Sequence, residues 1–255
     1  MPLTPFAGDL EPEGEYDGVL FADGAFDEAI ADRCRFLDCS FSNVSFAGTS
    51  LRKCRFTDVA ITGARFVAAD LAETAWQDVT LTGCALAGVQ AYSASLSRVT
   101  FRDGKLDSVN FRNGTLTDVR FENCLLRDIE FGGATLRRVG FGGSTLTQAD
   151  FARVTCTEVD LRDAELGISA GYESLRGATI DSGQLIGLAP LLARHLGIVV
   201  TDLLFWVCIT TGMMWPWCTP GPSASTVTGA RRASWSSSPR SAAASSSSSA
   251  AAAER

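Results

Sequence analysis

The chain has 255 residues, of which 46% are hydrophobic, and a formal net charge of −7. This length suffices for one substantial core with appendages, and the acidic balance disfavours direct binding to nucleic acid, which prefers basic surfaces. The chain has one histidine, His195, and no Cys-x-x-Cys motif. The usual Cys/His metal clusters are therefore excluded, and so is any Ser/His/Asp catalytic set that does not use His195.

Residues 1–15 form a lead-in rich in proline, glycine and acidic residues. Over residues 1–37, nine acids and two bases give a net charge of −7, whereas residues 38–181 have eighteen acids and fifteen bases. The first residues lead into this acidic segment without the apolar stretch of a secretory signal. We therefore expect a cytoplasmic protein with reduced cysteines.

An apolar residue returns at every fifth position from Tyr16 to Leu166, always in the same phase, and a smaller residue often stands two positions earlier, as Cys34 does before Phe36. Five residues turn an α-helix through about 500°, so these centres would not share one helix face. In a straight strand, residues five apart lie on opposite sides. The chain therefore has to bend once in every five residues and coil around a core.

The kinds of apolar residue indicate how many sides each coil has. From Leu96 to Phe151 leucine and phenylalanine alternate, so like residues stack on like if each coil holds an even number of units. Two sides cannot enclose a core, and four sides with twenty residues per coil are the smallest solution. The pattern predicts two opposed phenylalanine ladders, with leucine ladders on the other two sides, and their members are Phe101, Phe121 and Phe141 in one and Phe111, Phe131 and Phe151 in the other.

These units resemble the pentapeptide-repeat family, whose consensus is A(D/N)LXX, in segments such as Ala149-Asp150-Phe151-Ala152-Arg153 and Val159-Asp160-Leu161-Arg162-Asp163. The resemblance covers about 150 of the 255 residues. It implies an all-β fold, a right-handed quadrilateral β-helix, with the centre and the residue two before it inside. We assign residues 16–182 to this β-helix.

Most outward positions hold Ser, Thr, Asp, Arg, Gly or Asn. Positions twenty apart align in this fold, so a candidate acidic interaction face, interrupted by Arg98 and Arg138, contains Asp38, Asp58, Asp78, Asp118 and Glu158. An ordinary solvated face is the alternative. Six of the eight cysteines occupy interior positions, where we expect free thiols that fill space. Cys34 and Cys54 lie one coil apart and are the one pair to test for a disulfide.

The five-residue phase breaks between Leu166 and Leu175, and residues 183–200 read as a short helix with an apolar segment, with Asp181 as N-cap. Pro190 would begin or kink the helix. The ending LRGATIDSGQLIGLAPLLARHLGIVV resembles that of pentapeptide proteins of the quinolone-resistance type, in which a final helix joins two rods. By that resemblance the candidate homodimer contact is Leu185, Leu188, Leu192 and Leu196. A monomeric cap over the last coil is the alternative.

Residues 201–255 change in composition. Leu203–Trp217 is apolar, but it is shorter than the roughly 20 residues that a membrane-spanning helix needs, which disfavours membrane insertion. Residues 223–255 are of low complexity, and we expect them to be disordered. A further alternative is that the residues after about Val200 are translated out of the original reading frame.

The sequence holds no catalytic, cofactor-binding or metal-binding motif, so we expect a protein that is not an enzyme and takes no cofactor. The favoured hypothesis is a rigid interaction scaffold with an unidentified protein partner. The family resemblance implies an alternative: a DNA mimic that binds DNA gyrase or topoisomerase IV and gives resistance to quinolones or gyrase poisons. The modest charge of residues 38–181 and the lack of loops that interrupt the coils disfavour that alternative.

Overall fold

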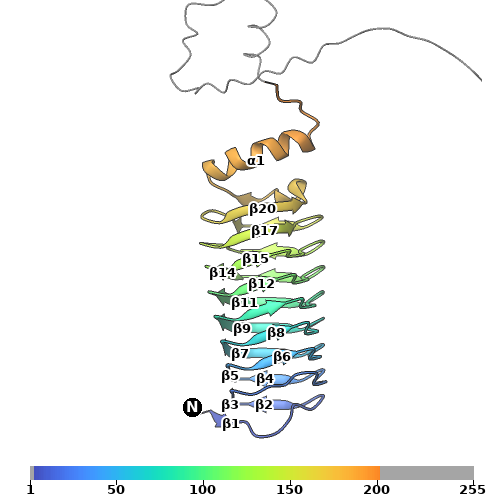
Figure 1. Ribbon diagram of the computed structural model, residues 1–255, viewed down its shortest axis with the longest axis vertical. Helices are drawn as coiled ribbons and strands as arrows, with labels where there is room; N and C mark the ends of the chain where they lie inside the picture. Colours follow the sequence, from blue (N-terminus) through green and yellow to red (C-terminus); the bar gives the residue numbers. More distant parts are fainter. Residues whose placement is uncertain (1–2, 202–255) are drawn as a thin grey trace, which may run out of the picture. The chain divides into compact units, whose positions relative to one another are not determined.

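The computed structural model describes residues 3–201. Its main body is a quadrilateral parallel β-helix, followed by one helix, α1 (Ser182–His195) (Figure 1). Phe36 is in register with Phe56, and Phe56 with Trp76, so successive coils are offset by twenty residues. The predicted fold and the predicted coil length are both confirmed.

Most strands are short because the chain turns a corner every five residues. The largest sheet covers two adjacent sides and contains β1 (Thr4–Pro5), β2 (Glu15–Asp17), β3 (Val19–Ala22), β4 (Arg35–Leu37), β5 (Ser40–Ser42), β7 (Arg55–Thr62), β9 (Ala75–Thr82), β11 (Ser95–Arg102), β13 (Thr115–Thr117), β14 (Arg120–Glu122), β16 (Thr135–Arg137) and β18 (Thr155–Thr157). A third side contains β6 (Ser45–Ala47), β8 (Arg65–Val67), β10 (Ala85–Ala87), β12 (Lys105–Asp107), β15 (Leu125–Arg127), β17 (Thr145–Asp150) and β20 (Glu165–Ala170). The two remaining strands, β19 (Val159–Asp160) and β21 (Ala178–Thr179), pair with each other. Single bridges such as Ser50 to Asp70 stack the fourth side.

The predicted ladders fill the interior. Phe121 stacks between Phe101 and Phe141 with ring centroids 4.9 and 5.0 Å apart. On the opposite side Phe131 stacks on Phe111 at 5.7 Å and meets Phe121 edge to face at 6.5 Å. Edge-to-face and offset contacts suit aromatic rings, and each buried ring removes a large apolar area from water.

Both ends of the core are covered. At the first coil, the half-buried Phe6 packs against Phe21 with ring centroids 4.6 Å apart, just after β1 pairs with β3. At the other end, β20 pairs with β17 through a β-bulge, which is where the five-residue phase breaks. The 3₁₀-helix η1 (Tyr172–Leu175) follows Gly171.

Helix α1 covers the last coil. Asp181 is its N-cap, as the sequence predicts, and forms a capping box with Gln184. Nε2 of Gln184 also donates hydrogen bonds to the carbonyl oxygens of Leu161 and Ala164, at 2.5 and 2.6 Å. Pro190 lies inside the helix rather than at its start, and Leu188 is buried with 3% of its surface exposed.

Candidate interaction surfaces

The five acidic residues of the candidate face lie in one row along a corner of the β-helix. Each is the second residue after a centre and has a left-handed backbone, with φ from 49° at Asp38 to 57° at Asp118. Arg98 and Arg138 occupy the same corner position with φ of 55° and 52°. We call these seven residues the corner row: Asp38, Asp58, Asp78, Arg98, Asp118, Arg138 and Glu158.

The two arginines of the corner row neutralise two of its carboxylates. Arg98 donates two hydrogen bonds to Asp78, at 2.5 and 2.7 Å, and Arg138 donates two to Asp118, at 2.5 and 2.6 Å. These bonds hold the pKa values of the Asp78 and Asp118 carboxyls below their ordinary range. Within the corner row, the carboxylates without an ion pair to a described residue are those of Asp38, Asp58 and Glu158.

Other sides carry the same kind of contact between neighbouring coils. Arg33 pairs with Glu13 at 2.6 Å and Arg35 with Glu15 at 3.0 Å, each across twenty residues. Sequence reasoning did not single out these pairs, although opposite charges at a spacing of twenty could have revealed them. Exposed ion pairs contribute little stability, typically about 0–1 kcal/mol. Their main effect is to neutralise charge locally on the surface.

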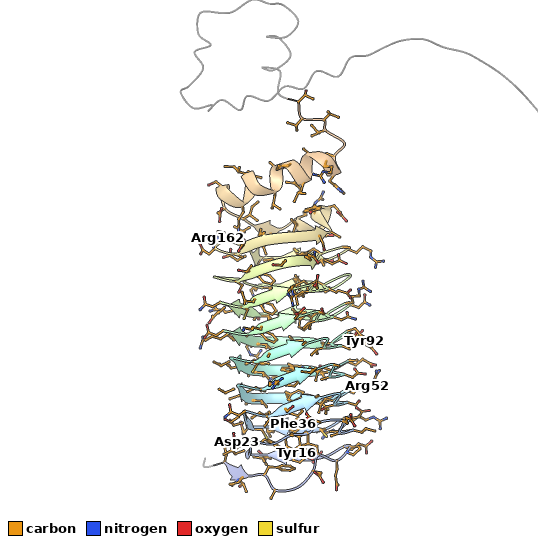
Figure 2. The ribbon with its side chains drawn as sticks, viewed as in Figure 1. Tyr16, Asp23, Phe36, Arg52, Tyr92 and Arg162 are labelled. Carbon is orange, nitrogen blue, oxygen red and sulfur yellow. The ribbon has the colours of Figure 1, made fainter. Side chains whose placement is uncertain are left out.

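A more extended polar cluster surrounds Arg52, which Figure 2 shows on the same side of the coils as Tyr92. The Arg52 guanidinium donates to Asp70 at 2.9 Å and to the hydroxyl of Tyr92 at 3.0 Å, and lies 3.4 Å from Glu73. These acceptors raise the pKa of Arg52 above its ordinary value. The cluster joins neighbouring coils, and no sequence motif indicated it.

The four leucines proposed as a dimer contact lie in two different environments. Leu188 is buried, and Leu192 packs partly buried against the core. Leu185 and Leu196 are 51% and 70% exposed. The exposed apolar surface also includes residues that the sequence analysis did not list: Ile186, Ile198, Val199 and Val200. Helix α1 therefore covers the last coil, and exposed apolar side chains lie both on α1 and on residues 196–200 after it.

The interior cysteines are free thiols. Cys34, Cys39, Cys54, Cys84 and Cys124 are buried, and Cys156 is half-buried. Cys34 and Cys54 each donate a hydrogen bond to a backbone carbonyl, at 3.0 Å, and form no disulfide. Burial raises the pKa of the Cys156 thiol to about 11, which keeps it protonated near neutral pH.

No group of three or more potential metal ligands occurs among residues 3–201. The nearest charged partner of His195 is Glu173, at 3.9 Å on the surface. Within the same residues, no helix has both the length and the apolar character needed to span a membrane. The expectations for Leu203–Trp217 and for the tail to residue 255, including the frame question, concern residues outside the described range.

Two family models match the chain. One, described as a pentapeptide repeat region, matches residues 74–151, and another, described as pentapeptide repeats in nine copies, matches residues 31–75. The two matches together span most of the coils described above. A comparison with curated proteins finds no match.

Solved structures with similar folds include full-length QnrB1, described as a plasmid-mediated fluoroquinolone resistance protein. It is 18% identical, with a TM-score of 0.38, and the match covers 70% of this chain and 100% of QnrB1. HetL from Nostoc sp. strain PCC 7120, described as involved in regulating heterocyst differentiation, is 19% identical, with a TM-score of 0.32, and the match covers 69% of this chain and 93% of HetL. At such identities the similarity concerns the fold alone.

Proposed function

The chain belongs to the pentapeptide-repeat family, and on that premise we propose that it is a non-enzymatic, rigid scaffold whose outer faces bind a protein partner. The observation that supports this most is the contrast between core and surface. The interior is filled, with Phe121, Phe131 and Phe141 fully buried, whereas outward side chains of neighbouring coils are held in register. A rigid surface loses little conformational entropy on binding, so a fixed pattern of side chains suffices for recognition.

Chemical crosslinking of the full-length protein in cell extract, followed by mass spectrometry, tests this function. We expect crosslinks to one partner to come from one side of the β-helix, and charge reversal on that side to abolish binding. The matched control reverses the same number of charges on the opposite side. A partner whose binding survives charge reversal on every side would contradict the scaffold.

A DNA mimic directed at DNA gyrase or topoisomerase IV is the second candidate. The observation in its favour is that Asp38 and Asp58, twenty residues apart in the corner row, have no ion pair among the described residues. A mimic should bind purified gyrase, inhibit supercoiling, and weaken steeply as salt rises, because binding to a DNA site is mainly electrostatic. Replacing both aspartates with Asn should weaken binding to gyrase further. Gyrase binding that changes neither with salt nor with these substitutions would exclude mimicry.

Assembly and location are part of the proposal. The exposed Leu185 of α1 and Leu196, which directly follows α1, support a homodimer through this end of the chain, because covering exposed apolar side chains with a second copy is favourable. The free interior thiols are compatible with the reducing cytoplasm. Fractionation of the native cell tests the location, and recovery outside the cytoplasm would contradict it.

A further inference from the structure

Two arginines lie in register on β4 and β7, strands that Figure 1 labels. Arg35 and Arg55 are register partners, and both are exposed. Like charges on neighbouring strands destabilise a sheet unless opposite charges neutralise them. Arg35 has Glu15 at 3.0 Å, whereas Arg55 forms no ion pair or side-chain hydrogen bond with residues 3–201.

The neighbouring column of charges shows what Arg55 lacks. Two residues earlier in each coil, Glu13 pairs with Arg33 at 2.6 Å, and Lys53 of the next coil pairs with Glu73 at 3.4 Å. That column therefore begins and ends on a carboxylate. The column of Arg55 begins on Glu15 and Arg35, but the register partner beyond Arg55 is Ala75. A carboxylate is missing at that position.

The ion pairs around Arg55 indicate the size of the missing group. We define the cation patch as Arg33, Arg35, Lys53 and Arg55. Three of its positive charges pair with the carboxylates of Glu13, Glu15 and Glu73, and Asp17, in register with Leu37, adds a further carboxylate to this side. The charge of Arg55 is the one in the patch without an ion pair among residues 3–201. One carboxylate would neutralise this charge. A polyanion or a dianionic phosphate would meet repulsion from the carboxylates already present.

The surface around Arg55 is also hollowed. A groove of about 290 Å³ is lined by Arg35, Leu37, Arg55 and Thr57, with Phe36 beneath them. A second groove of about 190 Å³ lies on the other side of Arg55, beside Ala75. Leu37 is 41% exposed, so an apolar group can be partly desolvated next to the charge. Partial desolvation strengthens an ion pair relative to one in open water.

We propose that Arg55 anchors a carboxylate of an acidic protein segment, seated where Ala75 leaves room, with an apolar neighbour of that carboxylate against Leu37. This inference rests on the proposed scaffold function for the source of the carboxylate, since it assigns the partner's recognition chemistry. The side of β4, β7 and β9 is then the partner-binding side. Bidentate pairing with a planar carboxylate suits the guanidinium fork.

The first test uses a small probe and needs no partner. In the full-length ¹⁵N-labelled protein, the Nε–Hε signal of Arg55 is followed by NMR during titration with N-acetyl-L-glutamate, N-acetyl-L-glutamine or inorganic phosphate. We expect a saturable shift with N-acetyl-L-glutamate and none with the neutral amide. No saturation, an equal response to the amide, or tighter binding of phosphate overturns the assignment.

The decisive variant is Ala75→Glu, which supplies the missing carboxylate from the chain itself. We expect it to bind N-acetyl-L-glutamate about tenfold more weakly than the native protein, as should Arg55→Gln. The matched controls are Ser95→Glu, one coil further from Arg55, and Arg65→Gln, on another side and also without an ion pair to residues 3–201. Neither should change probe binding. Unchanged probe binding by Ala75→Glu would overturn the proposal.

The partner experiment separates this inference from the scaffold function. A captured partner that is released by Ala75→Glu and Arg55→Gln, but not by the controls, supports both. A partner retained by all four variants leaves the scaffold standing and removes the site. If the probe binds specifically but no partner is captured at all, a carboxylate site remains and the scaffold function is contradicted.

Discussion

At the scale of single residues, the corners of the coils determine which side chains the surface can present. The residue two after a centre has a left-handed backbone even when it is Lys53 or Arg98, with φ of 59° and 55°. Such conformations are uncommon for residues other than Gly, Asn and Asp. These corners accept many residue types, but glycine adopts this backbone at the least cost. At Gly133 there is a further reason for glycine, because Oδ1 of Asn113 would lie 2.6 Å from an added Cβ.

We therefore expect Gly133→Ala to cost more stability than Gly83→Ala. Both residues have φ above 60°, but an added Cβ at Gly83 meets nothing within 4 Å. The left-handed backbone should cost about 1–2 kcal/mol in both variants, and the contact with Asn113 should add to it only at Gly133. Urea unfolding measures the difference. The excess cost should vanish in an Asn113→Ala background, and equal costs in the native background would disprove the contact.

The Asp118–Arg138 pair should make stability depend on pH. The arginine's hydrogen bonds lower the pKa of Asp118 in the folded protein below the value of about 3.9 expected when unfolded. The pair therefore contributes fully above about pH 4, and its contribution is lost as pH falls through the folded pKa. Melting temperatures from pH 7 to pH 3 should show Asp118→Asn less stable than the native protein at neutral pH, with the gap closing in acid.

Asp58→Asn is the matched control for this titration, because Asp58 has the same corner position and no ion pair to a described residue. Its melting temperature should differ little from that of the native protein across the same range. A gap for Asp118→Asn that stays constant down to pH 3 would show that the ion pair is not the cause.

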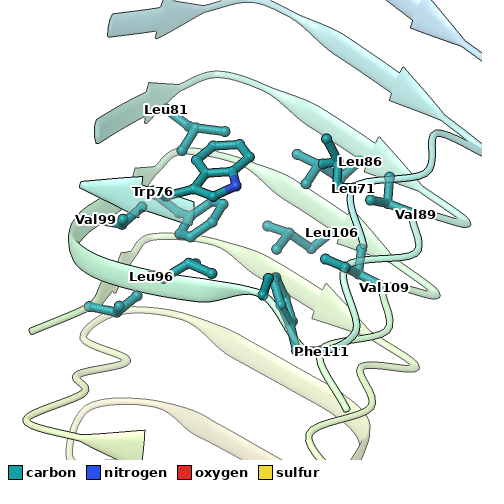
Figure 3. Close-up of a cluster of buried hydrophobic side chains, with 14 of the residues drawn as sticks. Leu71, Trp76, Leu81, Leu86, Val89, Leu96, Val99, Leu106, Val109 and Phe111 are labelled. Carbon is teal, nitrogen blue, oxygen red and sulfur yellow. The ribbon is translucent and has the colours of Figure 1, made fainter. Parts of the chain in front are cut away.

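At the scale of elements, the stacked ladders explain a local change in packing near the middle of the β-helix (Figure 3). One ladder runs through Leu71, Ala91 and Phe111, so a small residue stands between two large ones. The void that remains beside Ala91 is only about 10 Å³, and Trp76 of the adjacent ladder lines it. The indole of Trp76 is also fixed by a hydrogen bond to Thr74 at 2.9 Å. We infer that Trp76 fills the volume that the small side chain of Ala91 leaves.

Restoring a large residue at this position should destabilise the protein. We expect Ala91→Leu to cost about 1–3 kcal/mol because the void is smaller than the added side chain. In a Trp76→Leu background, which frees volume, the same change should cost much less. Denaturant unfolding of the four proteins in this double-mutant cycle measures the coupling, and purely additive costs would contradict the compensation.

Helix α1 should stabilise the last coil through its inward side. Leu188 is buried, so Leu188→Ala should cost about 2–5 kcal/mol. Hydrogen exchange should show the loss first in β20 and β21, since stability in a coil stack is transmitted between neighbours. Ile186→Ala is the control, because Ile186 is 74% exposed and should change exchange little. Equal effects of the two changes would show that α1 is not held against the core.

At the scale of the whole molecule, the exposed apolar residues of α1 and of the segment directly after it decide the proposed assembly. Leu196 is 70% exposed, so Leu196→Asp should leave the melting temperature of a monomer unchanged but weaken a dimer that buries it. Light scattering of the full-length protein over a concentration series measures the oligomeric state. We expect the native protein to be dimeric and Leu196→Asp to be shifted to monomer, while Arg65→Gln, on the side of the coils, remains dimeric. A native monomer at every concentration would remove the dimer.

The sequence by itself determined the coiled path, the twenty-residue period, the opposed ladders of Phe121 and Phe131, and the Asp181 N-cap of the helix. These features follow from the alternation of side chains along a strand and from the burial of every centre. With a strict period of five residues, both conditions are met only if the chain bends once per unit and coils around a core. The alignment of the corner row follows from the same period.

Only the tertiary structure decided which of these aligned groups interact. Arg98 and Arg138 neutralise Asp78 and Asp118, whereas Arg55 meets Ala75. Likewise Leu188 faces the core while Leu196 faces solvent. The repeat period determines on which side of the coil a residue lies. Ion pairing and burial depend in addition on side-chain conformations and on the side chains of the adjacent coil. Those are properties of neighbours brought together by folding, which a one-dimensional pattern does not contain.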